Sequence, residues 1–87
     1  PPAVQEAAVL GVPDALRGQV VKAFIVSDQP PSDSLTTGIQ DFVRARLSQH
    51  EYPRIIAFVP ELPKTPAGKV NRKALRAQEA SQRPEVA

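Results

Sequence analysis

Apolar positions along the chain first separate into three short runs, at residues 7–12, 20–26 and 55–59. Each run is rich in aliphatic or β-branched side chains and is followed within four residues by a proline. Short apolar runs that end at turn-forming residues are typical of strands. The pattern therefore predicts three strands, and residues 20–26 have the strongest β-forming composition of the three.

Between the second and third runs, the apolar spacing changes from strand-like to helical. The apolar positions then fall on one helical face that is expected to pack on a sheet, with Arg44 among the residues facing away: Leu35, Ile39, Phe42, Val43 and Leu47. The Ser-Asp-Ser segment at 32–34 can cap the start of this helix. Gly38 inside the helix costs about 1 kcal/mol relative to alanine, which the packing of Phe42 and Leu47 is expected to offset.

A second helix is predicted over residues 70–78, and the polar tail over 79–87 is expected to fray. The order strand, strand, helix, strand, helix predicts one α+β domain spanning residues 1–87. We expect a small three-stranded, mainly antiparallel sheet flanked by helices.

Composition narrows the possible chemistry. The 87 residues include no cysteine and a single histidine, His50, which is expected to be a surface residue at a helix end. Thiolate and histidine-rich metal sites are therefore excluded, and we predict no metal site. No apolar stretch is long enough to predict a membrane span, and the absence of cysteine fits a reducing cytoplasm. The chain has no initiating methionine and opens with Pro-Pro, so we expect an N-terminal portion to be missing.

Positive charge is concentrated near the C-terminus. The net charge is only +2, but residues 64–76 hold five of the eleven Lys and Arg and no acidic residue. Pro66 and Gly68 constrain a loop that delivers Lys69 at its tip. An ammonium group there suits an anionic ligand, because its three N–H groups can neutralise phosphate or carboxylate oxygens.

The segment 63–76, Pro-Lys-Thr-Pro-Ala-Gly-Lys-Val-Asn-Arg-Lys-Ala-Leu-Arg, closely resembles the last motif of the adenylate-forming superfamily. That superfamily includes acyl-CoA synthetases, peptide-synthetase adenylation domains and luciferases. Two further stretches match in the same order, residues 4–18 and the Tyr-Pro-Arg at 52–54, so the resemblance covers residues 3–76. The sequence of residues 52–59 is most similar to that of medium-chain acyl and aryl acid CoA synthetases.

The resemblance implies that this is the mobile C-terminal domain of such an enzyme, with the hinge and the large N-terminal domain absent. The large domain would bind the carboxylic acid, ATP and the accompanying Mg²⁺. The enzyme would form an acyl-adenylate, after which the small domain would rotate to present CoA for thioester formation. The isolated chain is accordingly expected not to turn over, and the acid substrate is set by the absent domain.

The resemblance also implies roles for individual residues. Lys69 matches the catalytic lysine, which lies between the substrate carboxylate and the α-phosphate, and Gly68 lets the backbone approach closely. Arg17 matches a position near the nucleotide end of CoA, with a turn-stabilising surface arginine as the other reading. Tyr52 matches another position near CoA, but packing beside Pro53 is favoured, and the preceding Glu51 stands where relatives often have lysine.

Lys69 has a further implied partner. Such lysines are acetylated in some bacterial relatives, so a lysine acetyltransferase and deacetylase are expected to act on Lys69 and switch its charge. The other cations of the basic segment are expected to form a solvated face without a catalytic role: Lys64, Arg72, Lys73 and Arg76.

Two other functions stay open at this point. One is an adenylation-domain fragment that serves a carrier protein in place of CoA. The other is a small basic nucleic-acid-binding module, which is disfavoured because the basic segment has no interleaved aromatic residues and the whole chain holds one Tyr and three Phe.

Overall fold

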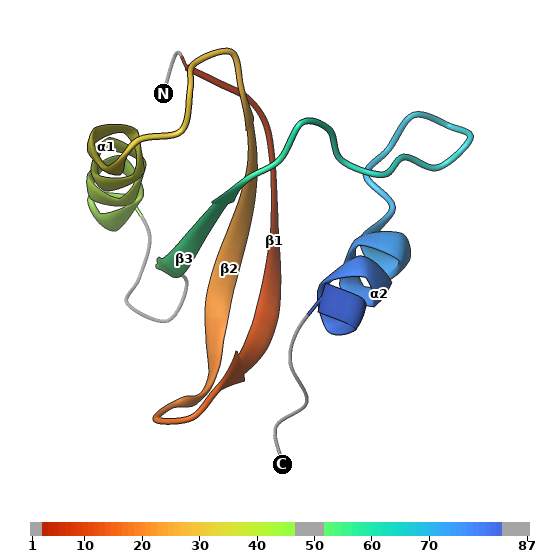
Figure 1. The fold of residues 1–87 in the computed structure, drawn as a ribbon, viewed down its shortest axis with the longest axis horizontal. Coiled ribbons are helices and arrows are strands. Elements are labelled where there is room, and N and C mark those ends of the chain that lie inside the picture. Colours follow the sequence, from red (N-terminus) through yellow and green to blue (C-terminus); the bar gives the residue numbers. More distant parts are fainter. Residues whose placement is uncertain (1–2, 47–51, 83–87) are drawn as a thin grey trace.

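The computed structural model describes residues 3–46 and 52–82 as five elements in chain order (Figure 1). They are the strand β1 (Val4–Asp14), the strand β2 (Gly18–Ser27), the helix α1 (Asp33–Arg44), the strand β3 (Pro53–Phe58) and the helix α2 (Arg72–Gln82). The predicted α+β class and the order of elements are confirmed.

The three strands form one sheet with β2 in the centre, in the order β1-β2-β3. β1 and β2 form an antiparallel hairpin in which Val9 is opposite Ala23, and this is the longer of the two pairings. β2 and β3 pair in parallel, with Ala23 opposite Ile56. The parallel pairing follows from the connection, because the chain crosses over through α1 before it re-enters the sheet. The sheet is therefore mixed, with its antiparallel part the larger.

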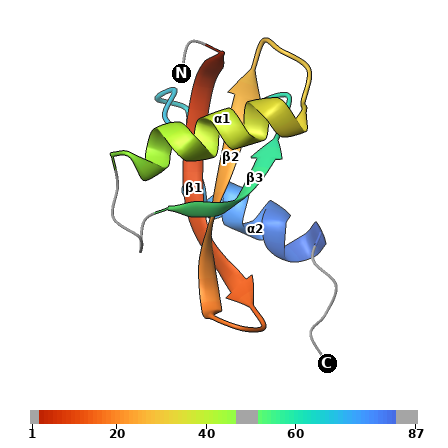
Figure 2. The same ribbon diagram turned by 90° about the vertical axis from the view of Figure 1, so that its left-hand side faces the viewer.

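The two helices cover opposite faces of the sheet, so that β2 contributes to a separate core on each side (Figures 1 and 2). Successive strand residues point to opposite faces, and Ala23 and Ile25 accordingly pack with Ile39 of α1 while Phe24 and Val26 face α2. The core on the α2 side is the larger, and its buried members are Ala8, Leu10, Val12, Val20, Phe24, Val26, Leu62 and Leu75.

Helix α1 begins where the sequence indicated, at a serine cap. The Ser32 Oγ accepts a hydrogen bond of 3.0 Å from the Leu35 N–H. The expected packing of Phe42 is wrong: its side chain is 40% exposed, and the Arg46 guanidinium lies 3.6 Å from its ring centroid. Phe42 lies at the edge of the apolar face, whose centre is Ile39, so an arginine covers it instead of the sheet. Leu47 lies outside the described residues.

Because Phe42 is exposed, it does not offset the cost of Gly38, and we expect Gly38→Ala to stabilise the domain. A Cβ at Gly38 would meet nothing within 4 Å, and φ there is not in the left-handed region. The expected gain is about 0.5–1 kcal/mol in free energy of unfolding, measured by urea denaturation. Gly18→Ala is the control: its Cβ also meets nothing, but φ is +78°, so it should destabilise. Equal effects of both substitutions would contradict this account.

Helix α2 extends beyond its predicted end and shortens the expected tail. Residues 79–82 are helical, and Glu79 is 7% exposed. Its Oε1 lies 2.7 Å from the Lys22 Nζ of β2, which also sits 5.0 Å from the Phe24 ring centroid. One charged residue of this polar segment, Glu79, is therefore paired inside the fold. The fraying expected from residue 79 is wrong for residues 79–82, which are helical. Residues 83–87 lie outside the described part of the chain.

Candidate functional site

Residues 64–70 form a short hairpin, called here the Lys69 hairpin, between β3 and α2. The Gly68 N–H donates to the Thr65 carbonyl at 2.9 Å, and the Thr65 N–H donates to the Lys69 carbonyl at 2.7 Å. Pro66 occupies the second turn position, where its fixed φ suits a type I turn, and Gly68 follows with φ of +85°. A type I turn followed by a left-handed glycine is a common three-residue hairpin loop. The turn itself thus requires glycine at position 68.

Both ends of the Lys69 hairpin are tied down. Lys64 and Val70 form an antiparallel bridge, and the Asn71 N–H donates to the Pro63 carbonyl at 2.8 Å. The Asn71 Oδ1 then accepts a bond of 3.0 Å from the Ala74 N–H and caps α2. This cap explains why α2 begins at residue 72 and not at the predicted residue 70.

Among the described residues the Lys69 side chain has no ion-pair partner, while its backbone is held by hydrogen bonds. Its N–H donates to the Thr65 Oγ1 at 3.3 Å, and the residue is exposed. Within residues 3–46 and 52–82, no carboxylate forms an ion pair with its ammonium group. The hairpin therefore presents the Lys69 ammonium without a carboxylate partner in this part of the chain, on a backbone held by hydrogen bonds.

Arg17 lies in the turn between β1 and β2. The Asp14 carboxylate accepts bonds from the Leu16 and Arg17 N–H groups at 3.1 and 2.9 Å, which closes the turn. The Arg17 guanidinium is 3.9 Å from the same carboxylate, and its side chain is 49% exposed. The Arg17 backbone therefore helps to stabilise the turn, while its side chain is only loosely held and available to an anion.

Tyr52 is paired with a residue that the sequence did not single out. Its hydroxyl accepts a hydrogen bond of 2.8 Å from Arg44 Nη2, and the Arg44 Cζ lies 4.8 Å from the ring centroid. Tyr52 is partly buried and immediately precedes β3, and Arg44 is the last residue of α1. No local spacing connects the two, because the contact depends on how α1 packs beside β3. Glu51 lies outside the described residues.

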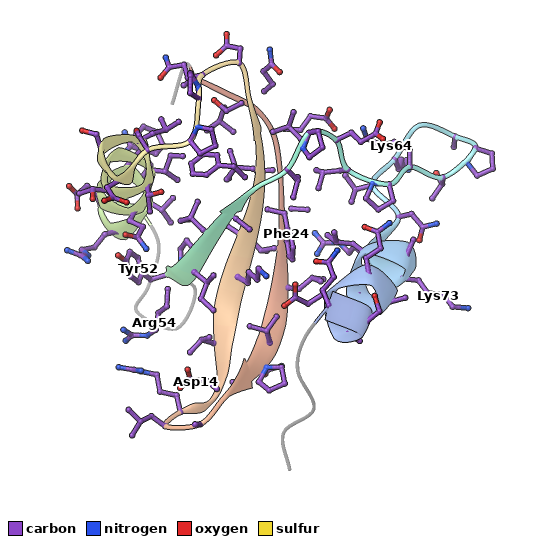
Figure 3. The ribbon with its side chains drawn as sticks, viewed as in Figure 1. Asp14, Phe24, Tyr52, Arg54, Lys64 and Lys73 are labelled. Atoms are coloured by element: carbon purple, nitrogen blue, oxygen red, sulfur yellow. The ribbon has the colours of Figure 1, made fainter. Side chains whose placement is uncertain are left out.

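The candidate residues form separate areas and not one cleft (Figure 3). In that view Lys64 marks the Lys69 hairpin on the α2 side, Asp14 marks the tip of the β1–β2 hairpin at the opposite end of the sheet, and Tyr52 lies on the α1 side. The structure brings Tyr52 together with Arg44, and it keeps Lys69 apart from Arg17.

Two further features set limits on this site. Among the described residues, no three His, Asp or Glu side chains come close enough to hold a metal ion. In the same part of the chain, neither helix has the length and apolarity needed to cross a bilayer.

Comparison with known proteins gives a consistent result. A family model described as the AMP-binding enzyme C-terminal domain matches residues 1–69. The mitochondrial acyl-coenzyme A synthetase ACSM1 of Homo sapiens is 48% identical over 85 residues, which are 93% of this chain and 15% of that protein. The 4-hydroxybutyrate–CoA ligase 1 of Metallosphaera sedula is 50% identical over 84 residues, 94% of this chain and 15% of that protein.

A solved structure extends the similarity to three dimensions. The acyl-CoA synthetase of Brucella canis superposes with a TM-score of 0.82 at 45% identity, covering 95% of this chain and 16% of the other. The chain thus spans about one sixth or less of the length of each of these proteins.

Proposed function

Because this chain belongs to the family of AMP-binding enzyme C-terminal domains, we propose that it is the lid domain of an ATP-dependent, AMP-forming acyl-CoA synthetase. The names of the relatives, an acyl-coenzyme A synthetase and a CoA ligase, supply the reaction class. A carboxylic acid first reacts with ATP to give an acyl-adenylate and pyrophosphate, and the acyl group then passes to the thiol of CoA with release of AMP. A large N-terminal domain completes the enzyme, and this chain alone is inactive.

The observation that carries the proposal is the exposed ammonium of Lys69, which has no carboxylate partner in residues 3–46 and 52–82, on a hairpin closed by backbone hydrogen bonds. Attack of a carboxylate on the α-phosphate brings two anions together and spreads negative charge over the phosphoryl oxygens. A cation that is already in place stabilises this charge without reorganising during the reaction. Lys69 acts as an electrostatic stabiliser and not as a nucleophile, and Gly68 gives the turn that aims it.

The basic segment offers less free charge than its sequence indicates. The Lys64 ammonium is paired with Glu6, and the Arg72 guanidinium donates to the Val9 carbonyl. The ion pair offsets one positive charge beside Lys69, whereas Arg72 keeps its charge and has one N–H directed to a backbone carbonyl. This favours a site for one small anionic group over a surface that tracks a phosphate backbone.

CoA would be bound away from Lys69, at Arg17 and at the pair formed by Tyr52 and Arg44. Separate faces suit an enzyme that turns one domain between two half-reactions. The Arg44 guanidinium supplies the positive charge for a CoA phosphate that Glu51 does not, and the Tyr52 ring orients it. Mg²⁺ would accompany ATP and would be held by the large domain.

Arg44→Ala tests the CoA face in the full-length enzyme. Loss of one charge-assisted hydrogen bond of about 1.5–3 kcal/mol should raise the KM for CoA by about tenfold or more and leave ATP–pyrophosphate exchange unchanged. Arg46→Ala is a matched control, because that guanidinium stacks on Phe42. An equal effect of both substitutions, or no change in the KM for CoA with Arg44→Ala, would contradict the assignment. A carrier-protein acceptor would be indicated if free CoA neither reacts nor competes.

Lys69 is also accessible to a modifying enzyme. Its exposed side chain just after the hairpin loop suits a lysine acetyltransferase and a matching deacetylase, and acetylation would remove the charge that the adenylation step uses. A cytoplasmic location stays a prediction.

The test of the proposed function is to measure the two half-reactions separately in the full-length enzyme carrying Lys69→Ala. Exchange of pyrophosphate into ATP reports adenylate formation, and thioester formation from a supplied acyl-adenylate reports the second step.

A further inference from the structure

Glu6 and Lys64 form an ion pair that joins β1 to the base of the Lys69 hairpin. The Lys64 Nζ lies 2.7 Å from the Glu6 Oε1, and the two side chains are 36% and 40% exposed. Glu6 precedes Ala8 by two residues in the strand, so it projects on the face that Ala8 shares with α2 and the Lys69 hairpin. The contact therefore links residues far apart in sequence at the point where the hairpin leaves the domain.

A second contact joins Arg72, the first residue of α2 and two positions beyond the hairpin, to the same strand. Arg72 Nη1 donates to the Val9 carbonyl of β1 at 2.8 Å. Leu62 is buried in the core on the α2 side, and Val70 packs against that core. The apolar contacts hold this segment against the core, and the two polar contacts join it to β1 on both sides of the hairpin.

We propose that Glu6 is a positioning residue for the adenylation reaction, acting through Lys64 to set the direction in which the hairpin presents Lys69. This inference rests on the proposed function. The hairpin projects away from the sheet (Figure 1), and Lys69 follows its three-residue loop next to the base residue Val70, so a rotation at the base redirects the Lys69 side chain. A misplacement of about 1 Å at a reacting centre can cost about a hundredfold in rate. Lys64 thereby has a geometric role and is not a ligand contact.

The first experiment compares Glu6→Gln with Glu61→Gln in the full-length enzyme. Both remove one negative charge close to the Lys69 hairpin, but Glu61 is exposed and has no polar partner among the described residues. We expect Glu6→Gln to lower kcat for ATP–pyrophosphate exchange by about tenfold, within the range for a displaced reacting group. The KM for ATP and thioester formation from supplied acyl-adenylate should stay unchanged, and Glu61→Gln should have no effect.

Lys64→Met and the double variant with Glu6→Gln provide the second measurement. If one contact links the residues, each single change should cost as much as the double change. Exchanging the charges, with Glu6→Lys and Lys64→Glu together, should restore most of the exchange activity. That rescue also decides the case in which Glu6→Gln alone fails to fold, because the exchanged pair keeps the contact.

The inference is overturned if Glu6→Gln leaves exchange within about twofold of wild type, if Glu61→Gln lowers it equally, or if the charge exchange rescues nothing. Lys69→Ala in the same assay separates this failure from that of the proposed function. If Lys69→Ala abolishes exchange and Glu6→Gln does not, only the positioning role of Glu6 is refuted. Retention of exchange with Lys69→Ala sinks the function.

Discussion

Lys69→Ala in the full-length enzyme is expected to lower carboxylate-dependent ATP–pyrophosphate exchange by about 100- to 1,000-fold, the usual loss when one preorganised electrostatic group is removed from a transition state. The effect should be this large because the Lys69 ammonium has no competing carboxylate among the described residues and rests on a hairpin closed by backbone hydrogen bonds. Thioester formation from supplied acyl-adenylate should survive, because Arg17 and Tyr52 lie on other faces.

Lys73→Ala is the matched control for that experiment. Lys73 is an exposed lysine in the first turn of α2, and its side chain points outward in Figure 3. The substitution removes the same charge as Lys69→Ala, four residues further along the chain. Its loss should change exchange by less than about twofold, because exposed charges near a helix start contribute little. If both half-reactions survive Lys69→Ala, or if Lys73→Ala is equally damaging, Lys69 is an ordinary surface lysine.

The second large effect is on stability. Glu79→Ala should lower the free energy of unfolding by about 3 kcal/mol, because it leaves the Lys22 ammonium without its carboxylate between β2 and α2. The Lys22 side chain is 17% exposed and that of Glu79 is 7% exposed, so solvent can compensate only in part. For a domain of this size, such a change lowers Tm by about 10 °C or more. Urea and thermal unfolding of the 87-residue chain measure both quantities.

Replacing both partners provides the control. Lys22→Met combined with Glu79→Leu removes the two charges together and fills similar volumes, so this pair should be close to neutral or stabilising. Asp41→Ala removes a carboxylate from an exposed pair, 4.0 Å from Arg44, and should cost less than about 0.5 kcal/mol. A Glu79→Ala effect no larger than that of Asp41→Ala would show that the buried pair does not hold α2.

Most of the fold follows from local patterns in the sequence. Apolar runs that end at prolines locate all three strands, although β1 extends from Val4 to Asp14 and not only over 7–12. The first and last residues of a strand lie at the ends of the sheet, where solvent can reach them, and they are often polar. An apolar run in the sequence therefore underestimates the length of the strand. The mixed direction of the strands depends on the crossover through α1, and the pairing of Glu79 depends on a lysine 57 positions away. Neither the strand direction nor this ion pair can be inferred from the spacing of neighbouring residues in the sequence.

The candidate site divides in the same way. The motif around Lys69 could be recognised from the sequence, because a tight turn restricts its residues to proline, glycine and a few others. The turn residues and the lysine are also neighbours in the sequence. The Arg44–Tyr52 pair and the Glu6–Lys64 contact could not be predicted, because each joins elements that meet only after the sheet and helices have packed. A role of Tyr52 at CoA stays a prediction from the resemblance, and the structure shows the Arg44 guanidinium beside its ring.

Both outer edges of the sheet are occupied by a side chain from a helix. On β1, Arg72 of α2 donates to the Val9 carbonyl, and on β3, Gln40 Nε2 of α1 donates to the Pro53 carbonyl at 3.3 Å. β3 is also short and begins with a proline, which cannot donate to another strand. An unpaired edge is a template for self-association through strand addition. Each of these two contacts occupies one backbone carbonyl of an edge strand, which makes strand addition at that position less favourable.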